Sequence, residues 1–139
     1  MGPVAILFGS ALIGVGLVGY FGTGTASVTA LIPAFLGLPL VLLGLLALKD
    51  SFRKHAMHLA AVIGLLGFLG AGYMARPKLH ALFANEPILR PDGKDARVAV
   101  LSQAVTAVLC GVFLALCVHS FIQARRRRKA AEAGPATPM

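Results

Sequence analysis

Four long apolar runs dominate the pattern of hydrophobic and polar positions along the chain. They cover residues 4–21, 28–48, 56–74 and 98–122, and none of them contains Asp, Glu, Lys or Arg. A helix that crosses a hydrocarbon core about 30 Å thick needs roughly 20 such residues. Membrane-spanning strands alternate apolar and polar residues within closed barrels, and these runs do not alternate. The pattern therefore predicts an all-α membrane protein, a bundle of four transmembrane helices.

Composition supports this class of protein. Of 139 residues, 58% are hydrophobic and 13% are charged, whereas soluble domains have about 45–50% apolar and about 25% charged residues. The first ten residues lack the basic side chains that begin a signal peptide, so we expect the first run to remain in the protein. We predict one transmembrane domain over residues 1–124, followed by a tail over residues 125–139 that is basic at first and then disordered.

Basic residues mark one side of the predicted bundle. The loop between the second and third runs carries Lys49, Arg53 and Lys54. The tail begins with a run of five basic residues, namely Arg125, Arg126, Arg127, Arg128 and Lys129. The positive-inside rule then places the N-terminus, this loop and the C-terminal tail in the cytoplasm. The loop before the fourth run is also basic, but its charges are spread over a longer segment that contains acids.

The basic tail predicts contact with the bilayer rather than with nucleic acid. A cluster of Lys and Arg next to a transmembrane helix attracts anionic lipid headgroups. The favoured interpretation, however, is that the cluster is a cytoplasmic anchor that only fixes the topology. The short loops and the Arg, Ala, Gly and Leu content favour a multi-pass protein of a bacterial inner membrane.

Small residues recur at helical spacing inside the runs. Helices in lipid associate through close packing of such residues, and we expect helix contacts at Gly9, Gly14, Gly37, Gly44, Gly64, Gly67, Ala71 and Gly111. Residues 14–19 also match the pattern GxGxxG. That fingerprint binds dinucleotides only between a strand and a helix, so here we interpret it as helix packing.

Two prolines interrupt the second run. Proline inside a helix frees the carbonyl group four residues earlier and bends the helix. We predict a kink near Pro39, whereas Pro33 is expected in the first turns of the helix, where proline is better tolerated.

Histidines supply the candidate ligand site. His55 and His58 begin the third run, and His119 lies near the end of the fourth. Their positions relative to Lys54 and Arg125 predict a similar depth on the same side of the membrane. Such a layer is able to ligate a metal or haem iron. Alternatively, the imidazoles simply meet headgroups and water, and the sequence specifies no cofactor.

The spans offer little to catalysis. None of them contains an acid, and the chain has no HExxH motif. Proton-coupled transport generally uses an ionisable group within a span. Cys110 and Cys117 lie seven residues apart on one helix, too far apart to form a disulfide. We therefore expect a protein that is not an enzyme.

Residues 19–48 contain glycines around a Gly-Tyr pair and a Gly/Ser turn, at Gly19, Tyr20, Gly24, Ser27, Gly37 and Gly44. In this pattern the segment resembles the transmembrane protein 14 family and small uncharacterised bacterial multi-pass membrane proteins. Pro33, Pro39 and the lack of a basic residue after Tyr20 depart from the family pattern. The resemblance implies a small helical membrane protein linked to porphyrin or lipid-like cargo.

Two functions are predicted. The first is a structural or accessory role, in which Gly/Ala helix faces assemble the chain with copies of itself or with a partner membrane protein. The alternative is a carrier or binder of a hydrophobic or metal-containing ligand such as haem, held by the histidine layer formed by His55, His58 and His119.

Overall fold

The computed structural model describes residues 2–24, 28–87 and 97–134. These residues form the helices α1 (Gly2–Gly22), α2 (Ile32–Leu46), α3 (Arg53–Phe83) and α4 (Arg97–Glu132), with a 3-10 turn, η1 (Val28–Leu31), before α2. Four helical segments are long and apolar enough to cross a membrane, counting η1 with α2. The prediction of an all-helical chain with four helices long and apolar enough to span a membrane is therefore confirmed over the described residues.

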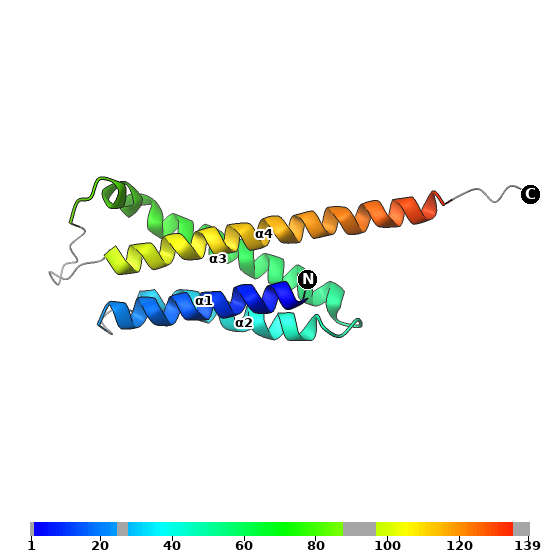
Figure 1. Ribbon diagram of the computed structural model, residues 1–139, viewed down its shortest axis with the longest axis horizontal. Helices are drawn as coiled ribbons and strands as arrows, with labels where there is room; N and C mark the ends of the chain where they lie inside the picture. Colours follow the sequence, from blue (N-terminus) through cyan, green and yellow to red (C-terminus); the bar gives the residue numbers. More distant parts are fainter. Residues whose placement is uncertain (1, 25–27, 88–96, 135–139) are drawn as a thin grey trace, which may run out of the picture.

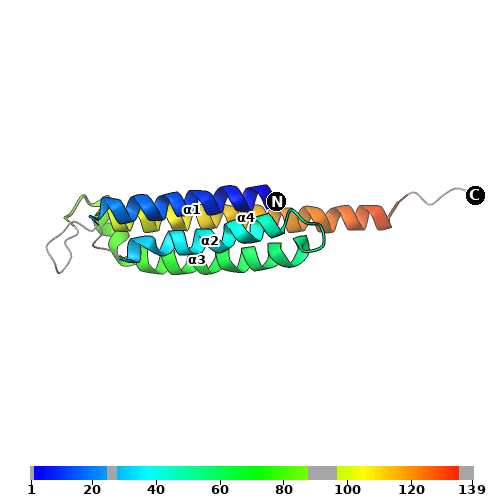
Figure 2. The same cartoon turned by 90° about the horizontal axis from the view of Figure 1, so that it is seen from below.

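The helices run alternately up and down the bundle (Figure 1). The N-terminus, the segment that joins α2 to α3, and the last turns of α4 all lie towards the same end (Figure 2). We call this the basic end, because it carries Lys49, Arg53, Lys54 and the basic run over residues 125–129. The other end is called the opposite end.

α1 and α2 form a hairpin whose backbones touch. A Cβ atom placed on Gly9 would lie 2.8 Å from the carbonyl oxygen of Gly37, and one placed on Gly37 would overlap the carbonyl oxygen of Gly9. A Cβ atom on Gly44 would lie 2.7 Å from the side chain of Ile6. Only glycine allows helices to approach this closely, and such close packing is a main source of helix association in lipid.

α3 and α4 form a second hairpin, in which larger side chains fill glycine notches. Gly64 receives the ring of Phe113, which would lie 3.0 Å from a Cβ atom at that position, and Gly67 receives the Sγ atom of Cys110 at 2.9 Å. Phe113 is fully buried. Its ring also packs on Phe8 of α1 at a centroid distance of 5.5 Å, so it joins the two hairpins.

Most of the small residues predicted to pack do so within this one chain. Gly9, Gly37, Gly44, Gly64, Gly67 and Ala71 are buried, and Gly111 is half-buried against the ring of Phe68. Gly14 is the exception, because it is exposed and no atom lies within 4 Å of its Cβ position. It precedes the buried Gly16 by two residues, which is about 200° around a helix, so it faces outward.

The helix ends differ from the predicted spans. Pro33 is confirmed in the first turn of α2, whereas Pro39 lies inside this unbroken helix and a kink there stays a prediction. α3 continues nine residues past position 74 and contains Pro77. Figures 1 and 2 show its last turns directed away from the axis of the rest of the helix.

α4 also continues further than predicted. It ends at Glu132, so the expectation of disorder directly after Lys129 is corrected for residues 130–132. Ala, Arg, Lys and Glu are strong helix formers, which explains the extension. Figures 1 and 2 show α4 projecting past the other helices at the basic end. Residues 135–139 of the predicted tail lie outside the described residues.

Candidate functional site

A groove opens between α3 and α4 at the basic end. Figure 1 shows these two helices crossing and then separating towards that end. The groove has a volume of ≈ 680 Å³ and is lined by residues from the segment before α3, the start of α3 and the second half of α4. Its lining consists of Asp50, Arg53, Lys54, Met57, His58, Cys117, Ser120, Phe121, Ala124, Arg125 and Arg128. We call it the basic groove.

The rim of the basic groove is cationic. It brings together Arg53 and Lys54 of α3 with Arg125 and Arg128 of α4, against the single carboxylate of Asp50. Asp50 and Arg53 form an ion pair of 4.0 Å, and both side chains are largely exposed. Such exposed pairs contribute little, about 0–1 kcal/mol. Lys54, Arg125 and Arg128 form no ion pair with any residue that the structure describes, so their charges are available to a ligand.

Two of the five residues in the basic run line the groove, because of their positions around the helix. Arg125 and Arg128 lie three positions apart, so they project from the same side of α4 and line the groove. Arg126, Arg127 and Lys129 do not line it. Cationic residues that line the groove therefore alternate, within one helix, with neighbouring cationic residues that do not line it.

The inner wall of the groove is apolar. Met57 and Cys117 are buried at 6% and 1% exposure. The rings of His58 and Phe121 pack across the two helices with centroids 4.8 Å apart. Cys117 precedes Arg125 by eight residues, which corresponds to about 12 Å along the helix axis. The groove therefore changes from an apolar interior to a charged mouth over that length.

His58 adds a polar group beside the apolar wall. Its Nδ1 atom lies 2.8 Å from the carbonyl oxygen of Lys54. Because a carbonyl oxygen can only accept a hydrogen bond, Nδ1 is assigned as the donor, and Nε2 of the neutral ring is left as an acceptor. This nitrogen is available to a ligand hydroxyl in the groove.

The predicted histidine layer is not assembled. Across the described ranges, which include all three residues, no group of three or more His, Cys, Asp and Glu side chains lies close enough to hold a metal ion. His58 lines the groove, whereas His55 and His119 do not. His119 lies two residues from both Cys117 and Phe121, which is about 200° around α4, so it points away from α3.

Sequence reasoning named some of the groove residues but not the groove. Arg125 and Arg128 were predicted to contact headgroups, and His58 was predicted as a ligand. Ser120 and Phe121 were missed, because their types carry no distinctive chemistry. A usable signal was present, since the third and fourth runs are antiparallel neighbours with basic residues at the same end.

Comparisons with known proteins add no relative. No family model matches the chain, and no match was found among the curated proteins or the solved structures. The resemblance of residues 19–48 to the transmembrane protein 14 family therefore stays a prediction, and the function must be inferred from the chain's own residues.

Proposed function

We propose that the chain is a multi-pass membrane protein that binds an anionic amphiphile, such as an acidic phospholipid, in the basic groove. The observation that carries this proposal is the order of the groove residues along the bundle axis. Four cations lie at the mouth, and the apolar wall of Met57, Cys117 and Phe121 lies further inside. A phospholipid has the matching order, an anionic headgroup above acyl chains.

The Arg and Lys side chains at the groove mouth are suited to bind a phosphate group. Arg donates paired N–H groups to phosphate oxygens, and Lys adds a compact positive charge. In the predicted topology the basic end faces the cytoplasm, where the membrane leaflet is anionic. Basic residues near such a surface contribute about 1 kcal/mol each. Two groove arginines removed together should therefore weaken binding by more than about tenfold.

The proposal is tested by native mass spectrometry of the purified chain with phosphatidylglycerol or phosphatidylcholine. We expect the wild-type chain to retain phosphatidylglycerol preferentially. Arg125→Gln combined with Arg128→Gln should lose that preference. The matched control, Arg126→Gln combined with Arg127→Gln, removes the same charge from the same helix and should keep it. If both double variants lost the preference for phosphatidylglycerol equally, the basic run would attract the lipid only through its overall charge, and the proposal would be contradicted.

A structural or accessory role through helix contacts is the second candidate. The observation in its favour is that Ser10 and Gly14 both lie exposed on α1, four residues apart, and that the Cβ position of Gly14 is open. The other glycines predicted to pack already contact neighbouring helices of the same chain. In membranes, Ser10→Cys should crosslink to a second copy, and adding Gly14→Leu should abolish the product. Val108→Cys, which is exposed on α4, is the control and should not crosslink.

A further inference from the structure

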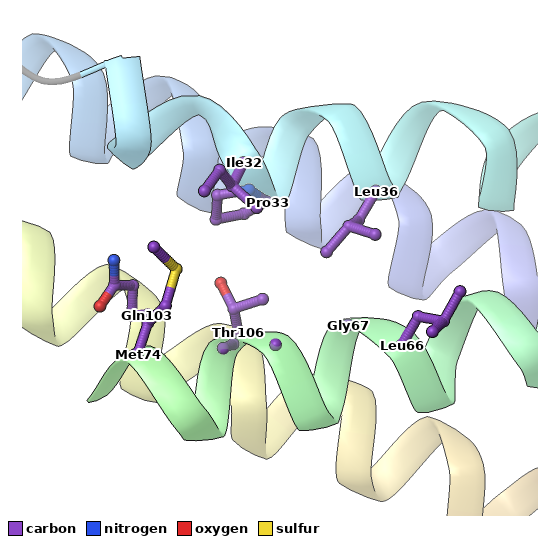
Figure 3. A pocket seen from close by; sticks show the side chains of 10 residues that line it. Ile32, Pro33, Leu36, Leu66, Gly67, Met74, Gln103 and Thr106 are labelled. Atoms are coloured by element: carbon purple, nitrogen blue, oxygen red, sulfur yellow. The ribbon is translucent and has the colours of Figure 1, made fainter. Parts of the chain in front are cut away.

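A second cavity lies between α2, α3 and α4, away from the basic groove. Its volume is ≈ 160 Å³. Figure 3 shows Ile32, Pro33 and Leu36 on one side, with Leu66, Gly67 and Met74 of α3 facing them. Gly70, Ala71, Gln103 and Thr106 complete the lining. Apolar cavities of about 150 Å³ hold molecules of the size of benzene, so this cavity accommodates a single ring or a short stretch of an alkyl chain.

Gly70 lines the cavity. A Cβ atom added at Gly70 would meet no atom within 4 Å. Gly70 is also exposed at the surface of the bundle, so the cavity is accessible there. Since α3 is one of the helices suited to cross a membrane, an apolar molecule would enter at Gly70 from the surrounding hydrocarbon rather than from water.

One polar side chain in the cavity lacks a partner. The amide of Gln103 forms no hydrogen bond with any residue that the structure describes. Figure 3 shows it at one end of the cavity, beside Met74. The hydroxyl of Thr106 already donates to the carbonyl oxygen of Ser102 at 2.6 Å. An unpaired amide is costly in an apolar environment, so Gln103 favours a ligand that carries a hydrogen-bond acceptor.

We infer that this cavity binds the apolar body of a membrane-soluble molecule whose carbonyl group accepts a hydrogen bond from the Gln103 amide. Two sources supply this chemistry, a free quinone ring and the acyl ester of a bilayer lipid. Gln103 lies six residues after Arg97, about 9 Å along α4 from the charged start of that helix. A ligand that is bound at Gln103 can therefore extend its polar part along α4 towards Arg97, at the opposite end of the bundle. The inference is independent of the basic groove.

The test measures retention of two probes, a short-chain ubiquinone and phosphatidylcholine, by the full chain in native mass spectrometry. We expect one bound molecule per chain for at least one probe, and the probe that is retained identifies the source. Gly70→Leu should weaken retention by about tenfold or more, because its side chain fills the cavity. Gln103→Leu should weaken it several-fold through loss of the hydrogen bond.

The matched control is Gly72→Leu. Gly72 lies on the same helix, and its Cβ position is also free of atoms within 4 Å, but it does not line the cavity. Gly72→Leu should therefore bind as the wild-type chain does. If Gly70→Leu fails to fold, Gly70→Ala in combination with Gln103→Leu provides the same comparison. Retention of neither probe by the wild-type chain, or equal retention by the Gly70 and Gly72 variants, would overturn the inference.

Discussion

The two hairpins of this protein are built from similar small residues and yet differ in what they leave open. α1 and α2 bring glycine against glycine, as at Gly9 and Gly37, so their backbones touch. α3 and α4 place Phe113 and Cys110 into glycine notches instead, and they separate towards the basic end (Figure 1). Backbone contact closes an interface, whereas side-chain contact holds helices together at their crossing point and lets grooves form beyond it.

Charge follows the same division. Residues 1–48 contain no Asp, Glu, Lys or Arg, so every charged side chain lies in residues 49–139. The first hairpin is therefore uncharged, and the second carries the residues of the proposed binding groove. Substitutions in each hairpin test this division.

The largest effect is expected where backbones touch. Gly37→Leu places a side chain against the backbone of Gly9, and neither helix can yield without separating the hairpin. We expect failure to fold, or a loss of more than about 3 kcal/mol in the free energy of unfolding. Circular dichroism during denaturation in detergent measures this. Gly14→Leu, at an open position of the partner helix, should change stability little, and similar losses in both variants would remove the basis of the comparison.

The contact between the hairpins should come next. Phe113→Ala leaves a cavity between Phe8 and the notch at Gly64, and large-to-small changes at buried aromatic residues cost about 3–5 kcal/mol in soluble proteins. We expect a loss of about 2–3 kcal/mol in the free energy of unfolding here. The cost is smaller because a side chain in a bilayer is not transferred from water when the helices associate. The same denaturation experiment with Phe35→Ala, which is 67% exposed, provides the control. A Phe35 effect as large as that of Phe113 would contradict the assigned core.

Charge reversal in the groove should alter binding rather than stability. Lys54→Glu introduces a carboxylate at the rim, and we expect the affinity for phosphatidylglycerol to fall by about tenfold or more. Lys49→Glu makes the same change at an exposed residue that does not line the groove. It should have a much smaller effect in lipid titrations. An equal loss of affinity in both variants would assign the attraction to the whole basic end.

The histidines provide the smallest expected difference. His58→Ala removes the ring that packs on Phe121 and should weaken lipid binding by about two- to fivefold. His119→Ala should leave binding unchanged, because His119 does not line the groove. Metal content is measured on the same samples. A stoichiometric metal that disappears in both variants would restore the histidine layer and contradict the groove as the principal site.

The sequence was sufficient to predict four helices long and apolar enough to span a membrane, because a bilayer requires long uninterrupted apolar runs. It also identified most packing glycines. It did not separate Gly14 from Gly16, or His119 from Phe121, because spacing shows which residues share a helix face but not which face meets a neighbour. The groove depends on where α3 and α4 separate, and the Gln103 cavity depends on three helices, so neither is visible in one run.

The most direct test of the central claim is photo-crosslinking with a phosphatidylglycerol that carries a diazirine near the headgroup end of one acyl chain. Proteolysis and mass spectrometry would then locate the adducts in nanodiscs. Binding in the basic groove predicts adducts concentrated at Met57, Cys117 and Phe121, and their loss in the Arg125→Gln, Arg128→Gln double variant. Adducts spread evenly over outward-facing residues such as Leu7 and Val108, and unchanged in that variant, would show that lipid only surrounds the bundle.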